Sequence, residues 1–399
     1  MLERPYRFKG RATCKNRGGR CADLKFLLIT FDFPPSIGGI QTRVYNYVKN
    51  LVKSGHDVLL VHLVEPEEWR NYFESSGKEV IVERVHGAEV LRFKYLLKDT
   101  LKIFLVVVRR LSGNRPDVVH VFSGINLIVG NLFLAYGLLK RCKVGVSLFG
   151  KDYLASRPNP IYFMPLIFSL FLARRIGVNS RATLTLLPEI FKKKARILYP
   201  GVDAQELQKA VSVRGADGEE RILFVGRLVR RKGPDVLVRA FNLLLKDHPR
   251  ARLIVVGDGP FAGQLKALVE ELGLNDKVEF TGQLRGIQLY SKYAECDVFV
   301  MPSRQTSTDM EGFGMVFLEA GFFGKPCIGT RTGGIVEAVL EGETGLLVPQ
   351  DDEVALRDAI DHVLKDRELA RRLGDRARER VSSEFTWERA TSRFIAMFC

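Results

Sequence analysis

Short apolar runs alternate with amphipathic stretches along most of the chain. In the first half, apolar runs of strand length lie at residues 24–30, 57–63, 117–122, 143–149, 175–178 and 196–199. A helical pattern from Gln41 to about Lys53 separates the first two runs. Strands that alternate with helices favour a parallel sheet covered on both faces. The first half is therefore predicted to be an α/β domain.

The same alternation starts again after residue 220. The strands expected there lie at residues 221–226, 253–257, 277–280, 298–301, 327–329 and 345–349, and the helices at residues 235–245, 353–373 and 386–398. A chain of 399 residues is too long for one typical core. We expect two α/β domains, joined by a polar linker.

The stretch from Cys296 to Gly324 combines several signals of a ligand site. After a short strand, the segment Glu311-Gly312-Phe313-Gly314 leads into the apolar helix pattern MVFLEAGFF. Two glycines at a helix entrance let the backbone approach a ligand, and the free N–H groups of the first turn favour an anion. Glu311 lies outside that turn and Glu319 inside the helix, so we interpret them as holding two separate sets of hydroxyls. The alternative is an acidic cap and one buried glutamate.

Two further glycine loops follow predicted strands. Gly38-Gly39 opens the first helix, an arrangement that presents backbone donors to a phosphate. The basic loop from Gly226 to Gly233 carries Arg227 and Lys232, which suit a diphosphate. A solvated basic turn is the alternative for this loop. The Gly257-Asp-Gly-Pro turn is a poor dinucleotide fingerprint, because Pro260 removes a backbone donor.

The formal charge of +15 is unevenly distributed. Residues 1–203 hold 33 Lys and Arg against 16 Asp and Glu, whereas residues 204–399 have a net charge of −2. This asymmetry indicates an anionic partner, either nucleic acid or an anionic membrane surface. The basic amphipathic stretch from Tyr95 to Arg115 fits a helix on a membrane or a core helix with snorkelling side chains.

Several classes of site lack support in the sequence. The six histidines form no ligand cluster, no Asp-x-Asp pair is placed for a metal, and no nucleophilic Ser-His-Asp or Cys-His set emerges from the spacing. Neither a membrane span nor a signal peptide is expected. The predicted location is therefore the cytoplasm, with peripheral association at the inner face of the membrane as a further expectation. Reduced thiols are expected for the six cysteines.

Taken together, these motifs resemble those of the retaining glycosyltransferases of family 4. GRLVRRKG, GDGP, FTG, MPS, EGFGMVFLE, TGG and GETGLLV follow one another in the family's order, preceded by PPSIGGI and PGVD. The resemblance implies a GT-B fold, with two facing Rossmann-like domains, parallel sheets and an interdomain cleft. It divides the chain into a basic tail (1–22), an N-terminal acceptor domain (23–203), a linker (204–220), a nucleotide-sugar-binding domain (221–383) and a last helix (384–399) crossing back to the first domain.

The resemblance also assigns roles to residues of the second domain. Arg227 and Lys232 would hold the donor diphosphate and, with Glu311, form the catalytic set. Glu311 and the Gly312-Phe313-Gly314 segment would hold the donor sugar, and Glu319 the ribose. The family transfers sugar with retention and without a metal or other cofactor, and no enzymic nucleophile is expected.

In the first domain, Gly39 would bring its backbone to the phosphate region. Gly38, Phe149 and Asp152 are candidates for the acceptor or sugar pocket. Phe149 departs from the family pattern, in which a histidine lines the donor-sugar pocket at this place. Phenylalanine cannot hydrogen-bond a hydroxyl, so the departure puts sugar binding and turnover in doubt. An apolar residue that closes a strand is the structural alternative.

The function that we expect from the sequence is hexosyl transfer from a nucleotide-diphospho-sugar to an acceptor hydroxyl, either on a lipid or glycan at the membrane surface or on a soluble acceptor. Two alternatives remain. One is a catalytically weak or inactive sugar-nucleotide-binding protein, motivated by Phe149. The other is a non-specific nucleic-acid-binding protein, since the basic half lacks the aromatic and basic pattern of specific recognition.

Overall fold

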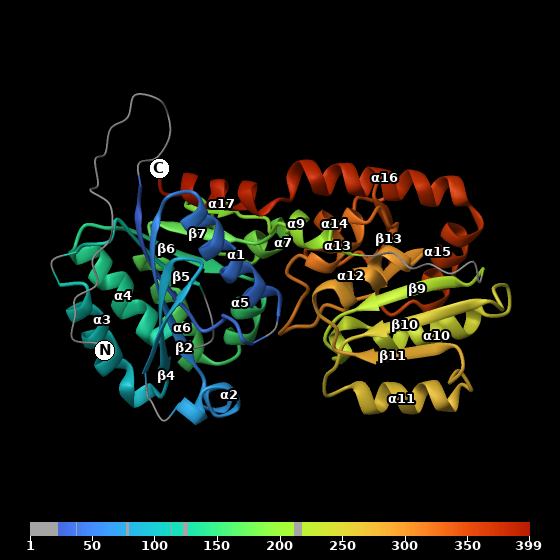
Figure 1. Ribbon diagram of the computed structural model, residues 1–399, viewed down its shortest axis with the longest axis horizontal. Coiled ribbons are helices and arrows are strands. Elements are labelled where there is room, and N and C mark those ends of the chain that lie inside the picture. The colour runs from blue at the N-terminus through green and yellow to red at the C-terminus, as the bar shows by residue number, and fades with distance from the viewer. Residues whose placement is uncertain (1–22, 37, 77–79, 113, 123–126, 211–217) are drawn as a thin grey trace. The chain divides into compact units, whose positions relative to one another are not determined.

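The computed structural model describes residues 23–36, 38–76, 80–112, 114–122, 127–210 and 218–399. The predicted tail, residues 1–22, lies outside them. The chain forms two compact units (Figure 1). The first unit comprises the residues up to Tyr199 together with Trp387–Cys399, and the second comprises Pro200–Thr386. Each contains one α/β sheet, as predicted.

The described part of the first unit contains an eight-stranded sheet in the order β3-β4-β2-β1-β5-β6-β7-β8. Its strands are β1 (Lys25–Thr30), β2 (Asp57–Val64), β3 (Val80–Val85), β4 (Ala88–Lys94), β5 (Val118–Phe122), β6 (Lys143–Leu148), β7 (Arg175–Val178) and β8 (Ala195–Ile197). Neighbouring strands pair in parallel except for β3 and β4, which form an antiparallel hairpin. His86 and Gly87 turn this hairpin with φ values of 50° and 92°. The hairpin is absent from the sequence prediction.

Helices pack on this sheet. They are α1 (Gly39–Lys53), α2 (Pro66–Tyr72), α3 (Thr100–Arg110), α4 (Leu127–Leu139), α5 (Lys151–Ser156), α6 (Pro160–Leu172), α7 (Arg181–Leu186), α8 (Glu189–Lys192) and α17 (Trp387–Ala396). The predicted helix at residues 41–53 corresponds to α1, which begins two residues earlier, at Gly39.

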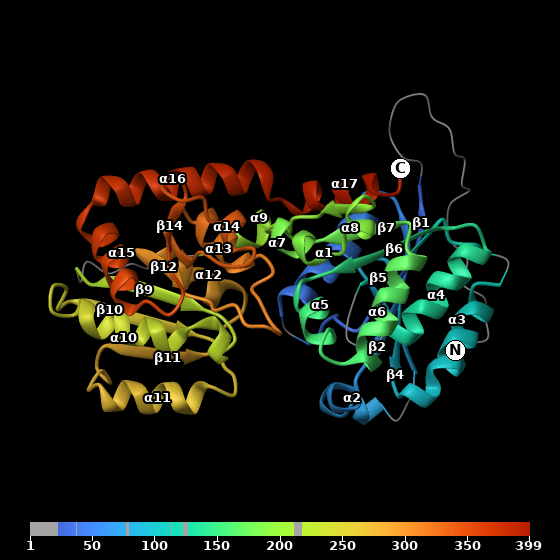
Figure 2. The same ribbon diagram turned by 180° about the vertical axis from the view of Figure 1, so that it is seen from behind.

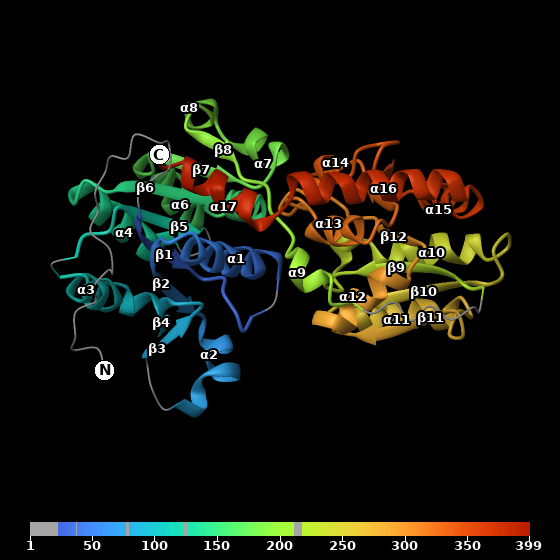
Figure 3. The same cartoon turned by 45° about the horizontal axis from the view of Figure 1, so that its top comes forward.

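The last helix, α17, completes the aromatic core of the first unit. It packs along α1 (Figure 3). The fully buried ring of Phe394 lies with its centroid 4.9 Å from that of Tyr47 on α1 and 4.8 Å from that of His120 on β5. Burial of such rings contributes much of the stability of a core. Residues from opposite ends of the chain therefore share one hydrophobic core.

The second unit contains a six-stranded sheet in the order β11-β10-β9-β12-β13-β14. Its strands, all paired in parallel, are β9 (Glu220–Val225), β10 (Ala251–Val256), β11 (Val278–Gly282), β12 (Val298–Met301), β13 (Cys327–Thr330) and β14 (Gly345–Val348). Numbered within the unit, the order is 3-2-1-4-5-6, that of a Rossmann fold. The order reverses between β9 and β12, where ligands of such folds bind beyond the carboxyl ends of the strands.

The helices of the second unit are α9 (Ala204–Leu207), α10 (Pro234–Leu244), α11 (Ala262–Glu271), α12 (Gly286–Glu295), α13 (Met315–Phe322), α14 (Ile335–Ala338), α15 (Glu353–Lys365) and α16 (Arg367–Glu384). The single helix predicted over residues 353–373 is wrong. Asp366 ends α15 and caps α16, because its carboxylate accepts a hydrogen bond from the Leu369 N–H at 2.8 Å. The stretch predicted as a linker begins with the short helix α9.

Two other expectations concern helix length and the cysteines. Among the described residues, no helix combines the length and the apolar content that crossing a membrane requires. Cys142, Cys296 and Cys327 are buried thiols, whereas Cys399 forms a disulfide. The expectation of reduced thiols is therefore wrong for Cys399.

Candidate active site

The loops that follow β9 and β12 in the second unit meet at the point where the strand order reverses. Residues 226–233 form the basic loop after β9, and residues 302–314 form the loop after β12. Gly233 has a φ of 69°, and a Cβ atom there would lie 2.0 Å from the carbonyl oxygen of Pro302. Only glycine therefore lets the basic loop end against the start of the second loop.

Two cations of the basic loop contact carboxylates of the second loop. Lys232 forms an ion pair with Glu311, and Arg231 Nη1 lies 2.9 Å from the same Glu311 oxygen. Arg231 Nε lies 3.0 Å from Asp309 Oδ2. The fold thus joins Lys232 and Glu311, two predicted site residues that are 79 positions apart in the sequence.

The surroundings of Glu311 fix its charge. Burial raises the pKa of this carboxyl, but the Lys232 ammonium and the Arg231 guanidinium outweigh burial and lower the pKa to about 2. At neutral pH the side chain is therefore a carboxylate, which accepts hydrogen bonds from the two cations and can accept them from a hydroxyl. The side chain is 12% exposed, so these interactions are only weakly screened by solvent.

The predicted cation Arg227 takes no part in the ion pairs that join Arg231 and Lys232 to Glu311 and Asp309. The Arg227 side chain is exposed, as is that of Arg230 on the same loop. Arg231, which the sequence prediction did not single out, makes the contacts with Glu311 and Asp309 instead. The sequence could not distinguish among the arginines of this short loop. They are chemically identical, and only the folded backbone sets where each side chain points.

Arg304 is a further residue that sequence reasoning missed. Its guanidinium donates two hydrogen bonds to the Asp235 carboxylate, at 2.7 and 2.8 Å. Its backbone N–H donates to the Arg231 carbonyl at 2.7 Å. The fork of an arginine matches a carboxylate in this way. Arg304 therefore ties the loop after β12 to the basic loop and to the first turn of α10. The only signal in the sequence is its place, three residues beyond a predicted strand.

Glycines on two neighbouring loops pack closely against the backbone of the loops that carry the cluster. A Cβ at Gly334 would lie 2.2 Å from the Gly312 carbonyl oxygen, and the Gly334 N–H donates to the Glu311 carbonyl at 2.8 Å. On the other side, a Cβ at Gly259 would lie 2.4 Å from the Leu228 carbonyl oxygen. The TGG and GDGP motifs therefore have a packing role, which is to hold the backbones of the two site loops.

The helix α13 begins directly after Gly314, as predicted. Gly314 has a φ of 88°, which favours glycine at this turn. Phe313 is 3% exposed, and its ring centroid lies 5.6 Å from that of Phe385. The side chain of Phe313 thus belongs to the core, so a ligand could meet this residue only through its backbone.

Glu319, inside α13, has a different environment from Glu311. The Tyr293 hydroxyl donates a hydrogen bond to its carboxylate at 2.8 Å. Burial raises the pKa of Glu319 to about 7, although the bond from Tyr293 opposes the rise. Burial also raises the pKa of the nearby Tyr290 to about 12, with Glu319 contributing. Glu319 therefore titrates near neutral pH, whereas Glu311 stays ionised.

In the first unit, the glycine loop and the loop after β6 are close together. Phe149 is buried, and the Arg43 guanidinium on α1 lies 5.4 Å from the centroid of its ring. The Phe149 N–H donates to the Asp152 carboxylate at 3.1 Å. Phe149 thus has the packing of an apolar residue that closes a strand. A cation, Arg43, lies over its ring, and the sequence prediction did not include it.

Asp32 is a second residue of the first unit that the sequence did not indicate. It follows β1, and its carboxylate accepts a hydrogen bond from Gln41 at 2.7 Å. Burial and the negative charge of Asp152 raise the pKa of Asp32 to about 7. Gly38 and Gly39 lie on the same loop, and α1 begins at Gly39. The predicted pocket residues of this unit thus gather around Asp32 and Arg43.

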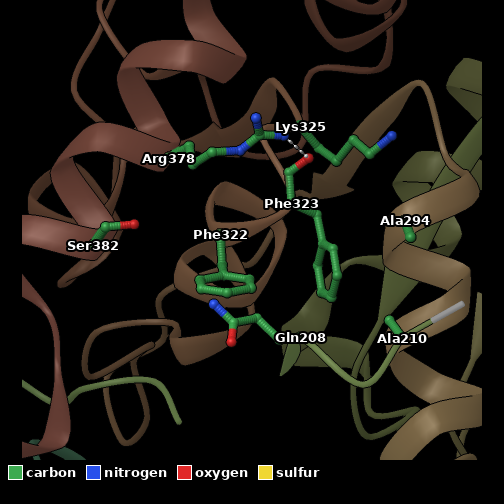
Figure 4. Close-up of a pocket in the computed structure, with 8 residues that line it drawn as sticks. All are labelled: Gln208, Ala210, Ala294, Phe322, Phe323, Lys325, Arg378 and Ser382. Atoms are coloured by element: carbon green, nitrogen blue, oxygen red, sulfur yellow. Dashed lines mark hydrogen bonds between the residues drawn. The ribbon is translucent and has the colours of Figure 1, made fainter. Parts of the chain in front are cut away.

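A hollow of about 560 Å³ lies elsewhere in the second unit (Figure 4). It is lined by Gln208, Ala210, Ala294, Phe322, Phe323, Lys325, Arg378 and Ser382. These residues surround the carboxyl end of α13, whereas Glu311 precedes its amino end. None of the predicted site residues lines this hollow. Among the described residues, no group of three or more His, Cys, Asp or Glu side chains is arranged to hold a metal ion.

Two families of known proteins match most of the chain. The family described as Glycosyltransferase Family 4 matches residues 37–206, and the family described as Glycosyl transferases group 1 matches residues 205–380. A GDP-mannose-dependent alpha-(1-6)-phosphatidylinositol monomannoside mannosyltransferase of Mycobacterium tuberculosis is 30% identical over 91% of this chain and 95% of its own length.

Two further proteins show the range of the likeness. An N-acetyl-alpha-D-glucosaminyl L-malate synthase of Bacillus anthracis is 25% identical over 91% of this chain and 94% of its own. Among solved structures, a sucrose-phosphate synthase of Thermosynechococcus elongatus superposes with a TM-score of 0.73 at 23% identity, covering 94% of this chain and 98% of that one. The latter shows that the two chains share the GT-B fold.

Proposed function

The chain belongs to the group 1 and family 4 glycosyltransferases, and we propose that it is a retaining, metal-independent hexosyltransferase. Its donor is a nucleotide-diphospho-sugar, and its acceptor is a hydroxyl group on a lipid or glycan. The observation that carries this proposal is the cluster of Lys232, Arg231 and Glu311 at the carboxyl ends of β9 and β12.

The proposed step needs positive charge at the leaving group. The bond between the sugar C1 and the phosphate oxygen breaks, and the acceptor oxygen bonds to C1 on the same face. The acceptor proton passes to the departing phosphate oxygen. The diphosphate gains negative charge as it leaves, and cations placed in advance lower the barrier. Lys232, Arg231 and the exposed Arg227 of the basic loop supply that charge in our proposal.

Glu311 has two roles in this scheme. Its carboxylate, held ionised by Lys232 and Arg231, accepts hydrogen bonds from hydroxyls of the donor sugar. It also orients the two cations before the donor binds, because both contact one of its oxygens. We assign the ribose hydroxyls to Glu319, whose partner Tyr293 fixes its carboxyl group on α13.

Two relatives bear on the class of acceptor. One relative acts on a phosphatidylinositol mannoside and another makes a malate glycoside. We propose a lipid-linked acceptor, since the basic charge of the first half suits an anionic surface.

A panel of UDP-, GDP- and ADP-sugars tests the function in two steps. One donor is expected to raise the melting temperature of the protein, since a ligand bound only by the folded state stabilises it. That donor is then incubated with EDTA and an acceptor extract, and we expect turnover and an α-configured product by NMR from an α-linked donor. Binding without turnover would favour an inactive sugar-nucleotide-binding protein. No stabilisation by any donor would remove the proposal.

A further inference from the structure

The helix α6 exposes a stripe of large apolar side chains. Four of them recur at spacings of three and four residues, so they lie on one side of the helix: Ile161 (73% exposed), Met164 (64%), Phe168 (54%) and Phe171 (58%). The opposite side of α6 is also apolar, and Leu166 and Leu170 there are fully buried in the core. The packing of the domain therefore uses one side of α6 and leaves the other to a partner.

The stripe continues onto the short helix α8. The rings of Phe171 on α6 and Phe191 on α8 have their centroids 4.9 Å apart, which places the carboxyl end of α6 next to α8. Ile190 on α8 is 64% exposed. We call the exposed side chains of Ile161, Met164, Phe168, Phe171 and Ile190 the apolar face. Contiguous exposed apolar surface of this kind marks an interaction site more often than scattered single residues do.

Positive charge surrounds the apolar face. No Asp or Glu occurs between residues 153 and 188. Arg157 precedes α6, Arg174 follows it and Lys193 follows α8, and all three are exposed. The next acidic residue, Glu189, forms an ion pair with Lys192, with 2.5 Å between Glu189 Oε1 and Lys192 Nζ.

The helix α3 has a similar outer side. Its inner side chains Ile103 and Val107 are buried, whereas Leu101 and Leu105 are exposed, beside the exposed cations Lys98 and Arg109. Figure 2 shows α3, α4 and α6 side by side on one face of the sheet, and α4 packs against both of the others. One side of α3 thus belongs to the core, and the other is exposed and basic. The interpretation of this segment as a helix on a membrane stays a prediction.

We propose that the apolar face, with the outer side of α3, binds the surface of an anionic lipid bilayer. Apolar side chains would enter the interface while the surrounding Arg and Lys meet the lipid headgroups, as in interfacial helices. A second copy of the chain is a poorer occupant, because a two-fold contact would bring the same cations together. Bilayer binding depends on the proposed glycosyltransferase function in one respect only, which is the link to a lipid acceptor.

Sedimentation with vesicles tests this surface directly. We expect the protein to pellet with phosphatidylcholine vesicles that contain 30% phosphatidylglycerol, at least about tenfold more strongly than with phosphatidylcholine alone, because each cation near an anionic surface adds favourable energy. The double variant Met164→Glu, Phe168→Glu should lose about tenfold or more in partitioning, since it removes apolar area and adds repulsion. Val354→Glu, at an exposed apolar position of α15, is the matched control and should bind normally.

Unchanged vesicle binding by the double variant, or equal binding of the native protein to both vesicles, would overturn the proposal. So would a dimer of the native protein that the double variant converts to a monomer, without vesicle binding by either. A melting temperature like that of the native protein shows that the double variant is folded. If its melting temperature is lower, the less disruptive variant Phe168→Ser is tested in its place. Failure of the glycosyltransferase proposal gives a different result, because vesicle binding would then persist without sugar transfer.

Discussion

The two candidate sites differ in how their charges are compensated. In the second unit, Lys232 and Arg231 are paired with Glu311 and Asp309, and the glycines of neighbouring loops hold the backbone beneath them. In the first unit, Asp32 is surrounded by other carboxylates that help to raise its pKa. There, Arg43 lies over an aromatic ring.

This difference indicates two modes of ligand binding. A paired and supported cluster keeps its geometry before a ligand arrives, so little reorganisation is needed when charge develops. Asp32, with its raised pKa, and Arg43, stacked on a ring, can still form hydrogen bonds or ion pairs with a ligand. We therefore expect the second unit to bind a donor of fixed chemistry. We expect the first unit to bind the acceptor.

Loss of a cation in the second unit should have the largest effect. Lys232→Ala removes charge from the leaving diphosphate and leaves Glu311 with one partner, and we expect kcat to fall about a hundredfold. Steady-state kinetics with saturating donor measure this. Arg230→Ala removes an exposed cation from the same loop and is the control. Equal losses in the two variants would show that only the total charge of the loop matters.

Glycine substitutions should lower the unfolding free energy more in the second unit than in the first. Gly233→Ala puts a side chain into a left-handed backbone and against the Pro302 carbonyl, and we expect a loss of about 3 kcal/mol in unfolding free energy. Gly38→Ala in the first unit meets only the flexible end of Gln41, so about 1 kcal/mol should be lost. Urea denaturation measures both. Similar losses would contradict the view that the second unit is the more rigidly supported.

A smaller effect should appear in the pH dependence of stability. Burial raises the pKa of Glu319 to about 7, so its protonated form stabilises the folded state below about pH 4.5, and this contribution is lost as the pH rises through 7. The Glu319→Gln variant stays neutral at this position. Between pH 5 and pH 8 its unfolding free energy should therefore fall by about 2 kcal/mol less than that of the native protein. Asp32 titrates in the same range in both proteins and cancels in the comparison. Parallel stability curves of the two proteins would show that the pKa of Glu319 is not raised in the folded state.

The strands and the strand-loop-helix units could be predicted because their signals are local. The apolar run 298–301, Pro302 after it, and the two glycines before Met315 each act within a few residues. Lys232 and Glu311 were identified for the same reason. The hairpin of β3 and β4 escaped prediction, because its turn, His86-Gly87, is not a common turn pair.

The contacts of Arg231, Arg304 and Arg43 could not be predicted, because each depends on a partner from another loop. The exposed side of α6 is a further case. The helix is apolar on all sides, so its sequence has no period from which an inner and an outer side could be assigned. Only the packing of Leu166 and Leu170 into the core shows which side remains exposed.

The placement of α17 has a consequence for synthesis. Phe394 fills the core beside Tyr47 and His120, yet it leaves the ribosome only after all of the second unit has emerged. Until α17 is made, the core of the first unit therefore lacks the ring of Phe394, while the second unit is already able to fold. Nascent chains that stall before residue 387 should accordingly be targets for chaperones and proteases, even though most of their sequence has already been made.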